Sequence, residues 1–404
     1  MKSEYSVAAV EVESETITNN DLDEPGGTKP RLKERGRINI KEIQVEKDNW
    51  YDWKWQLKNS IRSIKDLELV LSEKDISISD EIKEAAKVFS LAITPYYLSL
   101  IKDFSYNDPI YKMSIPSSEE LLNPSFLSND PLGEEHDCVV PNLVHRYDDR
   151  ALLVSTNKCA MNCRFCTRKR VTGSKDFHLT DKELDNAINY LKIHTEIKDV
   201  IISGGDPFTM PTSKLENILA RLRSVKSIEI IRIGTRTPVT LPMRITDELV
   251  DMLSKYHPVW VNTHFNHPNE ITDESKQAIL RLVNRGIPVN NQNVLLKGIN
   301  DDSSILSSLY KELLKIRVRP YYLFSCDKVI GTYHFHTKIE KGIEIINNLR
   351  GKISGLGIPH YIIDLPDGNG KIPLVPNYIE KVDGDKIIFR NLFNSNTEYI
   401  NSCE

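Results

Sequence analysis

The 404-residue chain lacks the features that mark membrane-spanning, secreted or nucleic-acid-binding proteins. It has no apolar run near the roughly 20 residues that cross a bilayer. Its N-terminal stretch is acidic, where a secretory signal needs an apolar core. The formal net charge of −4 gives no electrostatic reason to bind nucleic acid or an anionic membrane. We therefore expect a cytoplasmic protein with neither of these as partner.

Charge runs and apolar spacing divide the chain into four predicted regions. The first carries an acidic and then a basic run without helical or strand period, which predicts a disordered tail. The second is a predicted helical region, with helices through 61–71 and 81–101. The third holds repeated strand–helix units, and the fourth is a C-terminal segment and tail. In order, the regions are 1–43, 44–145, 146–350 and 351–404.

From Ala151 onward, short β-rich runs alternate with amphipathic segments. The runs are ALLVST, DVIIS, IEIIRIG, VWVNTH, PVNNQNVL and VRPYYLF, and HYIIDLP follows them. Such alternation implies parallel strands joined by right-handed crossovers. Six units are too few for a closed eight-stranded barrel, so we predict an α/β fold with a partial, three-quarter parallel β/α barrel. Chemistry is then expected beyond the carboxyl ends of the strands.

Helix boundaries also carry sequence signals. Thr180 with Glu183, and Ser213 with Glu216, have the spacing of a capping box at a helix start. Gly286 is expected to end a helix in the left-handed conformation that glycine tolerates.

Three of the six cysteines crowd into one loop directly after the first barrel strand. Three thiolates on a short loop can hold three corners of a 4Fe–4S cluster and leave one iron open to a small chelating molecule. Zinc prefers four protein ligands, usually in Cys-x-x-Cys pairs, and no second pair lies nearby. The spacing of Cys159, Cys163 and Cys166 is typical of radical S-adenosylmethionine enzymes. The isolated Cys138, Cys326 and Cys403 are read as small buried or partly exposed thiols.

A short glycine-containing motif stands at the end of the next strand: Ser203, Gly204, Gly205 and Asp206. Exposed backbone there can bind the amino group at the methionine end of S-adenosylmethionine. Taken alone, the motif is equally well a turn.

The stretch from Trp50 to about Arg390 resembles the lysine 2,3-aminomutase family, whose members use S-adenosylmethionine radical chemistry and pyridoxal phosphate. The matching blocks include HRYDDRALL, CRFCTRKR, ISGGDPF, RIGTRTPVTLP, YHPVWVNTHFNHPNEIT, VRPYYLF and IPLVPNY. The resemblance implies a partial barrel of the radical S-adenosylmethionine type and a C-terminal segment that binds pyridoxal phosphate. It also implies a homo-oligomer, either a dimer or a tetramer.

The resemblance assigns roles to residues that would otherwise read as ordinary surface or turn residues. Lys371, after a Gly-rich turn, matches the family lysine that forms the Schiff base with pyridoxal phosphate. Arg146 and Tyr147 match cofactor contacts, with Arg146 the first candidate for the phosphate and Arg150 the weaker one.

Further matches concern the substrate and S-adenosylmethionine. Arg168 aligns with the arginine that clamps the substrate α-carboxylate, for which a guanidinium has bidentate geometry. Asp327 and Asp364 match the two aspartates that hold the substrate's distal ammonium. Two carboxylates in one closed pocket repel unless a cation lies between them, which disfavours a glutamate-type substrate. His264 and Gln292 match residues of the S-adenosylmethionine pocket.

The sequence also departs from the family pattern. Members typically end in a cysteine-rich tail that binds zinc with a neighbouring subunit, but this tail has only Cys403, and Asp302 occupies the internal ligand position. We therefore expect no family zinc site. Phe324 replaces a tyrosine near the cofactors, and the turn before Lys371 is not all glycine. These changes leave the substrate open.

The resemblance implies a 2,3-aminomutase that acts on a basic amino acid, with lysine first and β-lysine as the product. A flavodoxin- or ferredoxin-like protein is the expected electron donor. In the alternative, the same cofactors act on arginine or a hydroxylated basic amino acid, by amino migration or by radical elimination. A non-enzymatic iron–sulfur scaffold is the third hypothesis.

Overall fold

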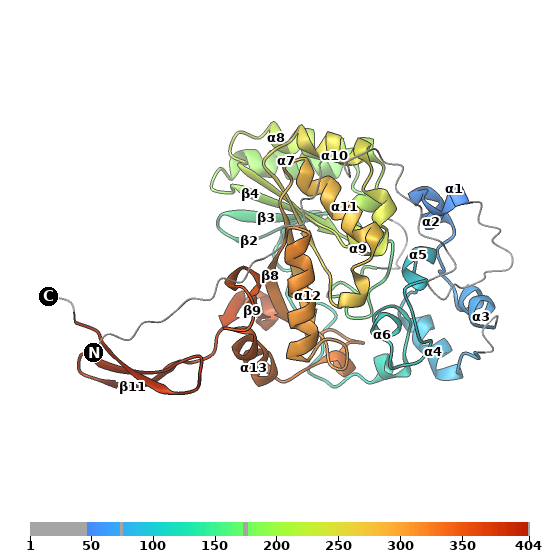
Figure 1. The fold of residues 1–404 in the computed structure, drawn as a ribbon. Helices are drawn as coiled ribbons and strands as arrows, with labels where there is room; N and C mark the ends of the chain where they lie inside the picture. Colours follow the sequence, from blue (N-terminus) through green and yellow to red (C-terminus); the bar gives the residue numbers. More distant parts are fainter. Residues whose placement is uncertain (1–46, 73–75, 173–176, 403–404) are drawn as a thin grey trace, which may run out of the picture. The chain divides into compact units, whose positions relative to one another are not determined.

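A ten-stranded sheet runs through most of the chain (Figure 1). It is seen in a computed structural model that describes residues 47–72, 76–172 and 177–402. The strands lie in the sheet in the order of the sequence, so each strand pairs with its chain neighbours. The predicted tail over 1–43 and Cys403 lie outside the described residues. Among the described residues, no helix combines the length and apolarity that a membrane crossing requires.

Seven consecutive strands are parallel, and they are the seven predicted runs. They are β3 (Arg150–Thr156), β4 (Asp199–Gly204), β5 (Ile230–Gly234), β6 (Val259–Thr263), β7 (Val289–Leu295), β8 (Val318–Ser325) and β9 (His360–Asp364). Helices cross between them: α7 (Asp181–Ile193), α8 (Thr212–Arg223), α9 (Thr237–Thr240), α10 (Asp247–Ser254), α11 (Asp273–Asn284), α12 (Ser303–Lys315) and α13 (Ile339–Leu349). Antiparallel strands flank this run at both edges of the sheet, so the predicted open, partial barrel is confirmed.

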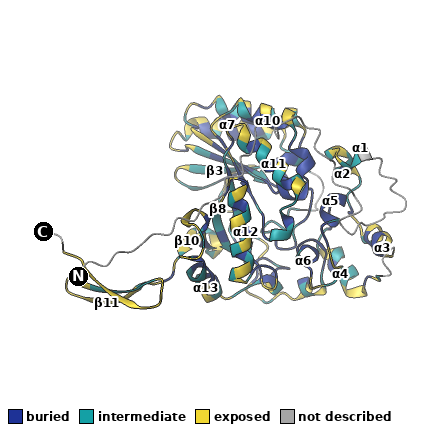
Figure 2. Cartoon of the chain, viewed as in Figure 1, coloured by how far each residue is buried: buried dark blue, intermediate teal, exposed yellow. Residues whose placement is uncertain are grey.

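The two faces of the parallel strands differ in burial. In β7, Val289 and Leu295 are buried and belong to the hydrophobic core, together with residues of the flanking helices. The alternate residues Asn290, Gln292 and Val294 are only partly buried. Parallel sheets covered by helices on both faces are apolar on both. This sheet departs from that pattern, because the face of β7 with Asn290 and Gln292 is the more open one. The opposite face is buried, and Asn293 there accepts from Tyr310 of α12, one of the helices that cover the sheet (Figure 2).

The N-terminal region is helical, as predicted, but its helices are short. They are α1 (Lys47–Trp50), α2 (Trp53–Lys58), α3 (Ile64–Ser72), α4 (Asp80–Val88), α5 (Pro95–Leu98), α6 (Pro109–Ser114) and the 3-10 turn η3 (Ser118–Leu121). The single helix predicted over 81–101 is wrong. The chain leaves the helix after Val88, and Ile93 forms an antiparallel bridge with Ile61. Pro95 keeps Thr94 extended, and Thr94 then caps α5.

Several elements have no counterpart in the sequence prediction. Strands β1 (Cys138–Val140) and β2 (Leu143–Tyr147) extend the sheet before β3, and β10 (Lys371–Leu374) pairs antiparallel with β9. The predicted boundary at 146 therefore falls inside β2, and the one at 351 follows α13. A separate antiparallel sheet contains β11 (Ile379–Asp383), β12 (Lys386–Arg390) and β13 (Asn396–Ile400). Short 3-10 turns are η4 (Pro207–Thr209), η5 (Pro242–Arg244), η6 (Pro268–Glu270), η7 (Tyr333–Phe335), η8 (Gly355–Gly357) and η9 (Pro366–Gly368).

Two of the three predicted helix-boundary signals are confirmed. Thr180 and Glu183 form the capping box of α7, and Gly286 follows α11 with φ of +75°. The predicted cap at Ser213 is wrong, because α8 already begins at Thr212 with Pro211 as its N-cap. Proline suits this place because the start of a helix does not need its missing N–H.

Candidate active site

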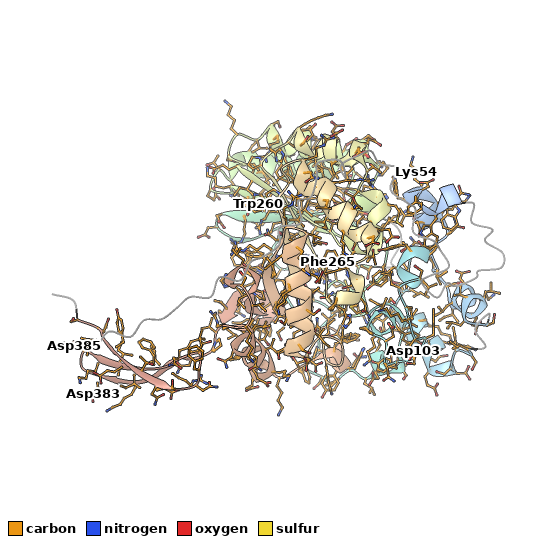
Figure 3. The ribbon with its side chains drawn as sticks, viewed as in Figure 1. Lys54, Asp103, Trp260, Phe265, Asp383 and Asp385 are labelled. Carbon is orange, nitrogen blue, oxygen red and sulfur yellow. The ribbon has the colours of Figure 1, made fainter. Side chains whose placement is uncertain are left out.

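The cysteine loop follows β3, at the carboxyl ends of the parallel strands. Trp260, near the start of β6, and Phe265, just after its end, mark the direction of that strand (Figure 3). Arg236 donates both to the His264 carbonyl and to Cys163, so the loop lies at the carboxyl end of β6. The backbone N–H of Arg168 donates to Cys166 Sγ at 3.3 Å, and Arg236 Nη1 donates to Cys163 Sγ at 3.0 Å. Donors aimed at sulfur stabilise thiolate ligands, so this loop fits a 4Fe–4S cluster.

The protonation of the cysteines gives a second test of that fit. Burial raises the pKa of Cys159, and it raises the pKa of Cys166 to about 11. Such thiols are protonated at neutral pH unless iron coordinates them. Among the described residues, no three His, Cys, Asp or Glu side chains gather to hold one metal ion. A cluster does not require that, because each of its cysteines binds a different iron.

A buried ion-pair network holds the cysteine loop against the N-terminal region. Arg164 donates to both oxygens of Glu120, at 2.9 and 2.6 Å, and Lys169 Nζ lies 2.7 Å from the same carboxylate. Burial alone would raise the pKa of Glu120, but these two charges lower it. Sequence reasoning missed Glu120. Its only signal was capping-box spacing from Ser117, which the structure confirms at η3.

Gly204 and Gly205 bring the end of β4 into contact with the start of the cysteine loop. A Cβ on Gly204 would lie 2.2 Å from the Thr156 carbonyl oxygen, and one on Gly205 would lie 2.4 Å from that of Lys158. The N–H groups of Gly205 and Asp206 donate to these same two oxygens. The glycines are therefore needed for this close approach.

Gly205→Ala is expected to destabilise the chain by about 1–3 kcal/mol, because backbone must move to admit the methyl group. The shift in the thermal unfolding midpoint measures this effect. Gly355→Ala is the matched control, because no atom lies within 4 Å of the added Cβ. Equal midpoints for the two variants would contradict the predicted crowding.

Asp206 has a structural use that the sequence did not reveal. Its carboxylate accepts from Thr235 Oγ1 at 2.5 Å and from the backbone N–H groups of Arg236 and Phe208 at 2.8 and 3.1 Å. These bonds join the ends of β4 and β5. The predicted contact of Asp206 with S-adenosylmethionine stays a prediction, and its carboxylate is already engaged within the fold.

Three partly buried polar residues lie on or just after three strands. Ser203 is the last residue but one of β4, His264 follows β6 and Gln292 lies in the middle of β7. Burial lowers the pKa of His264 to about 3, and the charge of Arg236 adds to this, so the imidazole is neutral at physiological pH. A neutral, half-exposed lining next to the cysteine loop fits S-adenosylmethionine. The individual contacts stay predictions.

The predicted cofactor lysine and both predicted aspartates come together beside the cysteine loop. Lys371 pairs with Asp364, its cross-strand neighbour on β9, and Lys371 Nζ lies 5.0 Å from the Phe324 ring centroid. Asp327 accepts a hydrogen bond from Thr167, next to Cys166. Burial raises the pKa of Asp327 to about 6; the hydrogen bond from Thr167 opposes this rise, and the nearby Asp364 charge adds to it.

Arg168 lies near Asp327 and has a partner that could not be read from the sequence. Its Nε and Nη2 atoms bind Glu134 at 2.9 and 2.6 Å, so one edge of the guanidinium is occupied. Its Nη1 atom, on the other edge, lies 3.5 Å from Ser203 Oγ. Glu134 stands in a region without periodic signal, so only the folded chain identifies it. The carboxylate-binding role of Arg168 stays a prediction.

The remaining predicted cofactor residues surround the turn before Lys371. Arg146 Nε lies 2.5 Å from Asp137, and a Cβ on Gly368 would lie 3.2 Å from this nitrogen. Tyr147 Oη is buried without a hydrogen-bond partner among the described residues. Arg150 lies over the Tyr147 ring at 4.2 Å. The unpartnered Tyr147 hydroxyl, near arginines and a glycine turn, fits a phosphate-bearing cofactor. The Nε atom of Arg146 already donates to Asp137, which leaves fewer of its donors for a phosphate.

Comparison with known proteins shows which families the chain resembles. Residues 153–306 match the Radical SAM superfamily, and residues 346–402 match the family described as Lysine-2,3-aminomutase. The chain is 47% identical to L-lysine 2,3-aminomutase of Acetoanaerobium sticklandii, over 88% of this chain and 86% of that protein. It is 45% identical to glutamate 2,3-aminomutase of Clostridioides difficile, over 85% and 81%. A radical SAM methyltransferase from Sphaerobacter thermophilus is 16% identical, with a TM-score of 0.42 over 55% of this chain and 67% of that one.

Proposed function

Because this chain belongs to the lysine 2,3-aminomutase family of radical S-adenosylmethionine enzymes, we propose that it moves the α-amino group of lysine to the neighbouring carbon and forms β-lysine. The proposal rests mainly on one observation: Asp364 pairs with the ammonium of Lys371, and the charges of both residues act on the nearby Asp327. A free amino-acid substrate with a distal ammonium supplies the same charge to the same carboxylates. A glutamate side chain would bring a third carboxylate to them.

Three cofactors suit the site. The 4Fe–4S cluster and S-adenosylmethionine supply a carbon radical that removes hydrogen, and pyridoxal phosphate supplies a conjugated ring that stabilises an unpaired electron near the migrating nitrogen. Cys159, Cys163 and Cys166 would hold the cluster. Lys371 would hold pyridoxal phosphate, with Tyr147 beside the turn. The electron donor, of flavodoxin or ferredoxin type, and the homo-oligomer stay predictions.

The protein's own contribution is binding and orientation. Arg168 would bind the α-carboxylate through the guanidinium edge that Glu134 leaves open. Asp327 and Asp364 would bind the other end of the substrate, and Thr167 fixes Asp327 relative to the cysteine loop. Asp364 also accepts a hydrogen bond from Lys371 Nζ, so it would hold this amine in place at the cofactor. Two anchored ends fix which substrate carbon faces the radical source.

Substrate choice is testable directly. The enzyme would be reconstituted anaerobically with iron, sulfide, pyridoxal phosphate, S-adenosylmethionine and a reductant, and then offered lysine, arginine, ornithine or glutamate separately. Mass spectrometry should detect β-lysine, and Asp327→Asn should lose most of this turnover. A guanidinium also fits two carboxylates, so turnover of arginine alone would replace lysine in the proposal. Turnover of glutamate alone would overturn the charge argument.

The pH dependence of lysine binding follows from Asp327. Its pKa of about 6 means that the carboxylate is protonated below that pH and no longer attracts the substrate ammonium. We therefore expect the KM for lysine to rise below about pH 6, by roughly tenfold per pH unit. Thr167, Asp364, Lys371 and Arg168 are the groups that act on Asp327. Asp327→Asn should raise KM and flatten the profile, and an unchanged profile would contradict the assignment.

A further inference from the structure

One buried arginine contacts a cysteine of the predicted cluster, and the predicted function gives it no role. Arg236 follows β5, at the start of α9, and is 8% exposed. Its Nη1 atom donates to Cys163 Sγ at 3.0 Å, and its Nε atom donates to the His264 carbonyl at 3.1 Å. A permanent positive charge therefore lies against one predicted cluster sulfur, out of reach of bulk solvent.

The counter-charge of Arg236 comes from a distant part of the chain. Arg236 Nη2 lies 2.6 Å from Glu270 Oε1 and 3.2 Å from Tyr97 Oη, and Tyr97 Oη donates to the same carboxylate at 2.7 Å. Glu270 is fully buried, and its second oxygen accepts the backbone N–H groups of Asn266 and His267. With both Glu270 oxygens occupied and every Arg236 nitrogen bonded, the geometry of the pair is fixed.

Charge and hydrogen bonding at the sulfur ligands are two of the quantities that set the reduction potential of an iron–sulfur cluster. Reduction adds one electron, converting one ferric equivalent to ferrous, and no bond forms or breaks. A low-potential flavin or iron–sulfur protein is the donor class. A nearby cation stabilises the more negative, reduced state, and a nearby anion opposes it. Both effects are large where water is excluded.

We propose that Arg236 raises the reduction potential of the cluster through Cys163, and that Glu270 positions Arg236 and limits this effect. The two residues then act with opposite signs on one measurable quantity. The inference rests on Cys163 being a cluster ligand, but not on which amino acid is the substrate. Arg236 is thus a positioning and tuning residue, since it acts through Cys163 and not on the reacting atoms.

The test is a redox titration of the reconstituted enzyme, followed by electron paramagnetic resonance without amino-acid substrate. At the wild-type midpoint, Arg236→Gln should lower the ratio of reduced to oxidised cluster at least tenfold, which equals about 59 mV for one electron. Arg236→Lys should keep most of the potential, because it keeps the charge. Glu270→Gln should raise the midpoint, because it removes a buried negative charge. Glutamine can still accept the N–H groups of Asn266 and His267, so this loop keeps its hydrogen bonds.

A second buried arginine provides the matched control. Arg244 is fully buried and donates to the carbonyls of Phe208 and Met210, but its hydrogen bonds reach no cysteine. Arg244→Gln should therefore leave the potential unchanged. Iron content reports whether each variant keeps its cluster. If Arg236→Gln loses it, the Glu270→Gln variant tests the inference alone: a raised midpoint supports it, and a lowered midpoint overturns it. A wild-type potential in Arg236→Gln, or equal shifts in the Arg236 and Glu270 variants, would overturn the inference. Because no substrate is present, failure of the lysine proposal cannot produce either result.

Discussion

Lys371→Ala is expected to lower aminomutase activity at least roughly 1,000-fold and to abolish the absorbance of bound pyridoxal phosphate. Lys371 starts β10, directly opposite Asp364 on β9, so its amine stands at a fixed place beside the cysteine loop. The other lysines of the described C-terminal segment lie elsewhere in the fold. Alanine removes the only amine at this position and leaves Asp364 without its cation.

The Lys371→Ala prediction has a matched control, and one specific result would contradict it. Lys386→Ala removes an exposed lysine on β12 that pairs with Glu398 at 3.1 Å, and this variant should retain both activity and absorbance. Iron content should stay unchanged in both variants, because neither lysine contacts the cysteine loop. A Lys371→Ala enzyme that still bound pyridoxal phosphate with the wild-type spectrum would contradict the assignment.

Replacing any of Cys159, Cys163 or Cys166 with alanine is expected to remove the cluster and all detectable turnover. The three thiols lie on one buried loop, and two of them already accept N–H donors. With one thiolate gone, a second iron would lack its protein ligand. Cys138→Ala is the control, because Cys138 is exposed on β1 and donates to the Val140 carbonyl, away from the cysteine loop. Iron and sulfide analysis should separate the two groups, and equal iron content would contradict the prediction.

The N-terminal helical region gains a role in this structure, because it holds the cysteine loop from one side. The N–H groups of Asn162 and Arg164 donate to the carbonyls of Ala92 and Met113, at 2.9 and 3.0 Å. The Glu120 carboxylate neutralises Arg164 within the same contact. These backbone and ionic bonds would be lost together if this region were removed, so we expect the barrel alone to hold the cluster poorly.

The parallel strands could be predicted because each carries its signal locally. A run such as DVIIS, bounded by helix-forming segments, identifies itself without reference to the rest of the chain. The helix predicted over 81–101 was wrong because that prediction, too, used only local apolar spacing. Residues around Ile93 are apolar because an extended segment is buried there, and apolar spacing alone does not distinguish this from a helix.

The candidate site divides in a similar way. The cysteine spacing and the turn before Lys371 are contiguous, so a sequence match can identify them. Glu134, Glu120 and Glu270 act only because folding brings each of them to an arginine at least 34 positions away. The sequence around a single loop glutamate does not indicate which distant arginine it will pair with. The ion pairs that position the site therefore required the structure.

Migration of the α-amino group to the neighbouring carbon is the central claim, and isotope labelling tests it most directly. Lysine labelled with ¹⁵N at its α-amino group would be incubated with the reconstituted enzyme, and the product examined by ¹³C and ¹⁵N nuclear magnetic resonance. We expect β-lysine with the label on carbon 3. Labelled ammonia released into solution, or lysine recovered unchanged from an enzyme that carries its full cluster and pyridoxal phosphate, would contradict it.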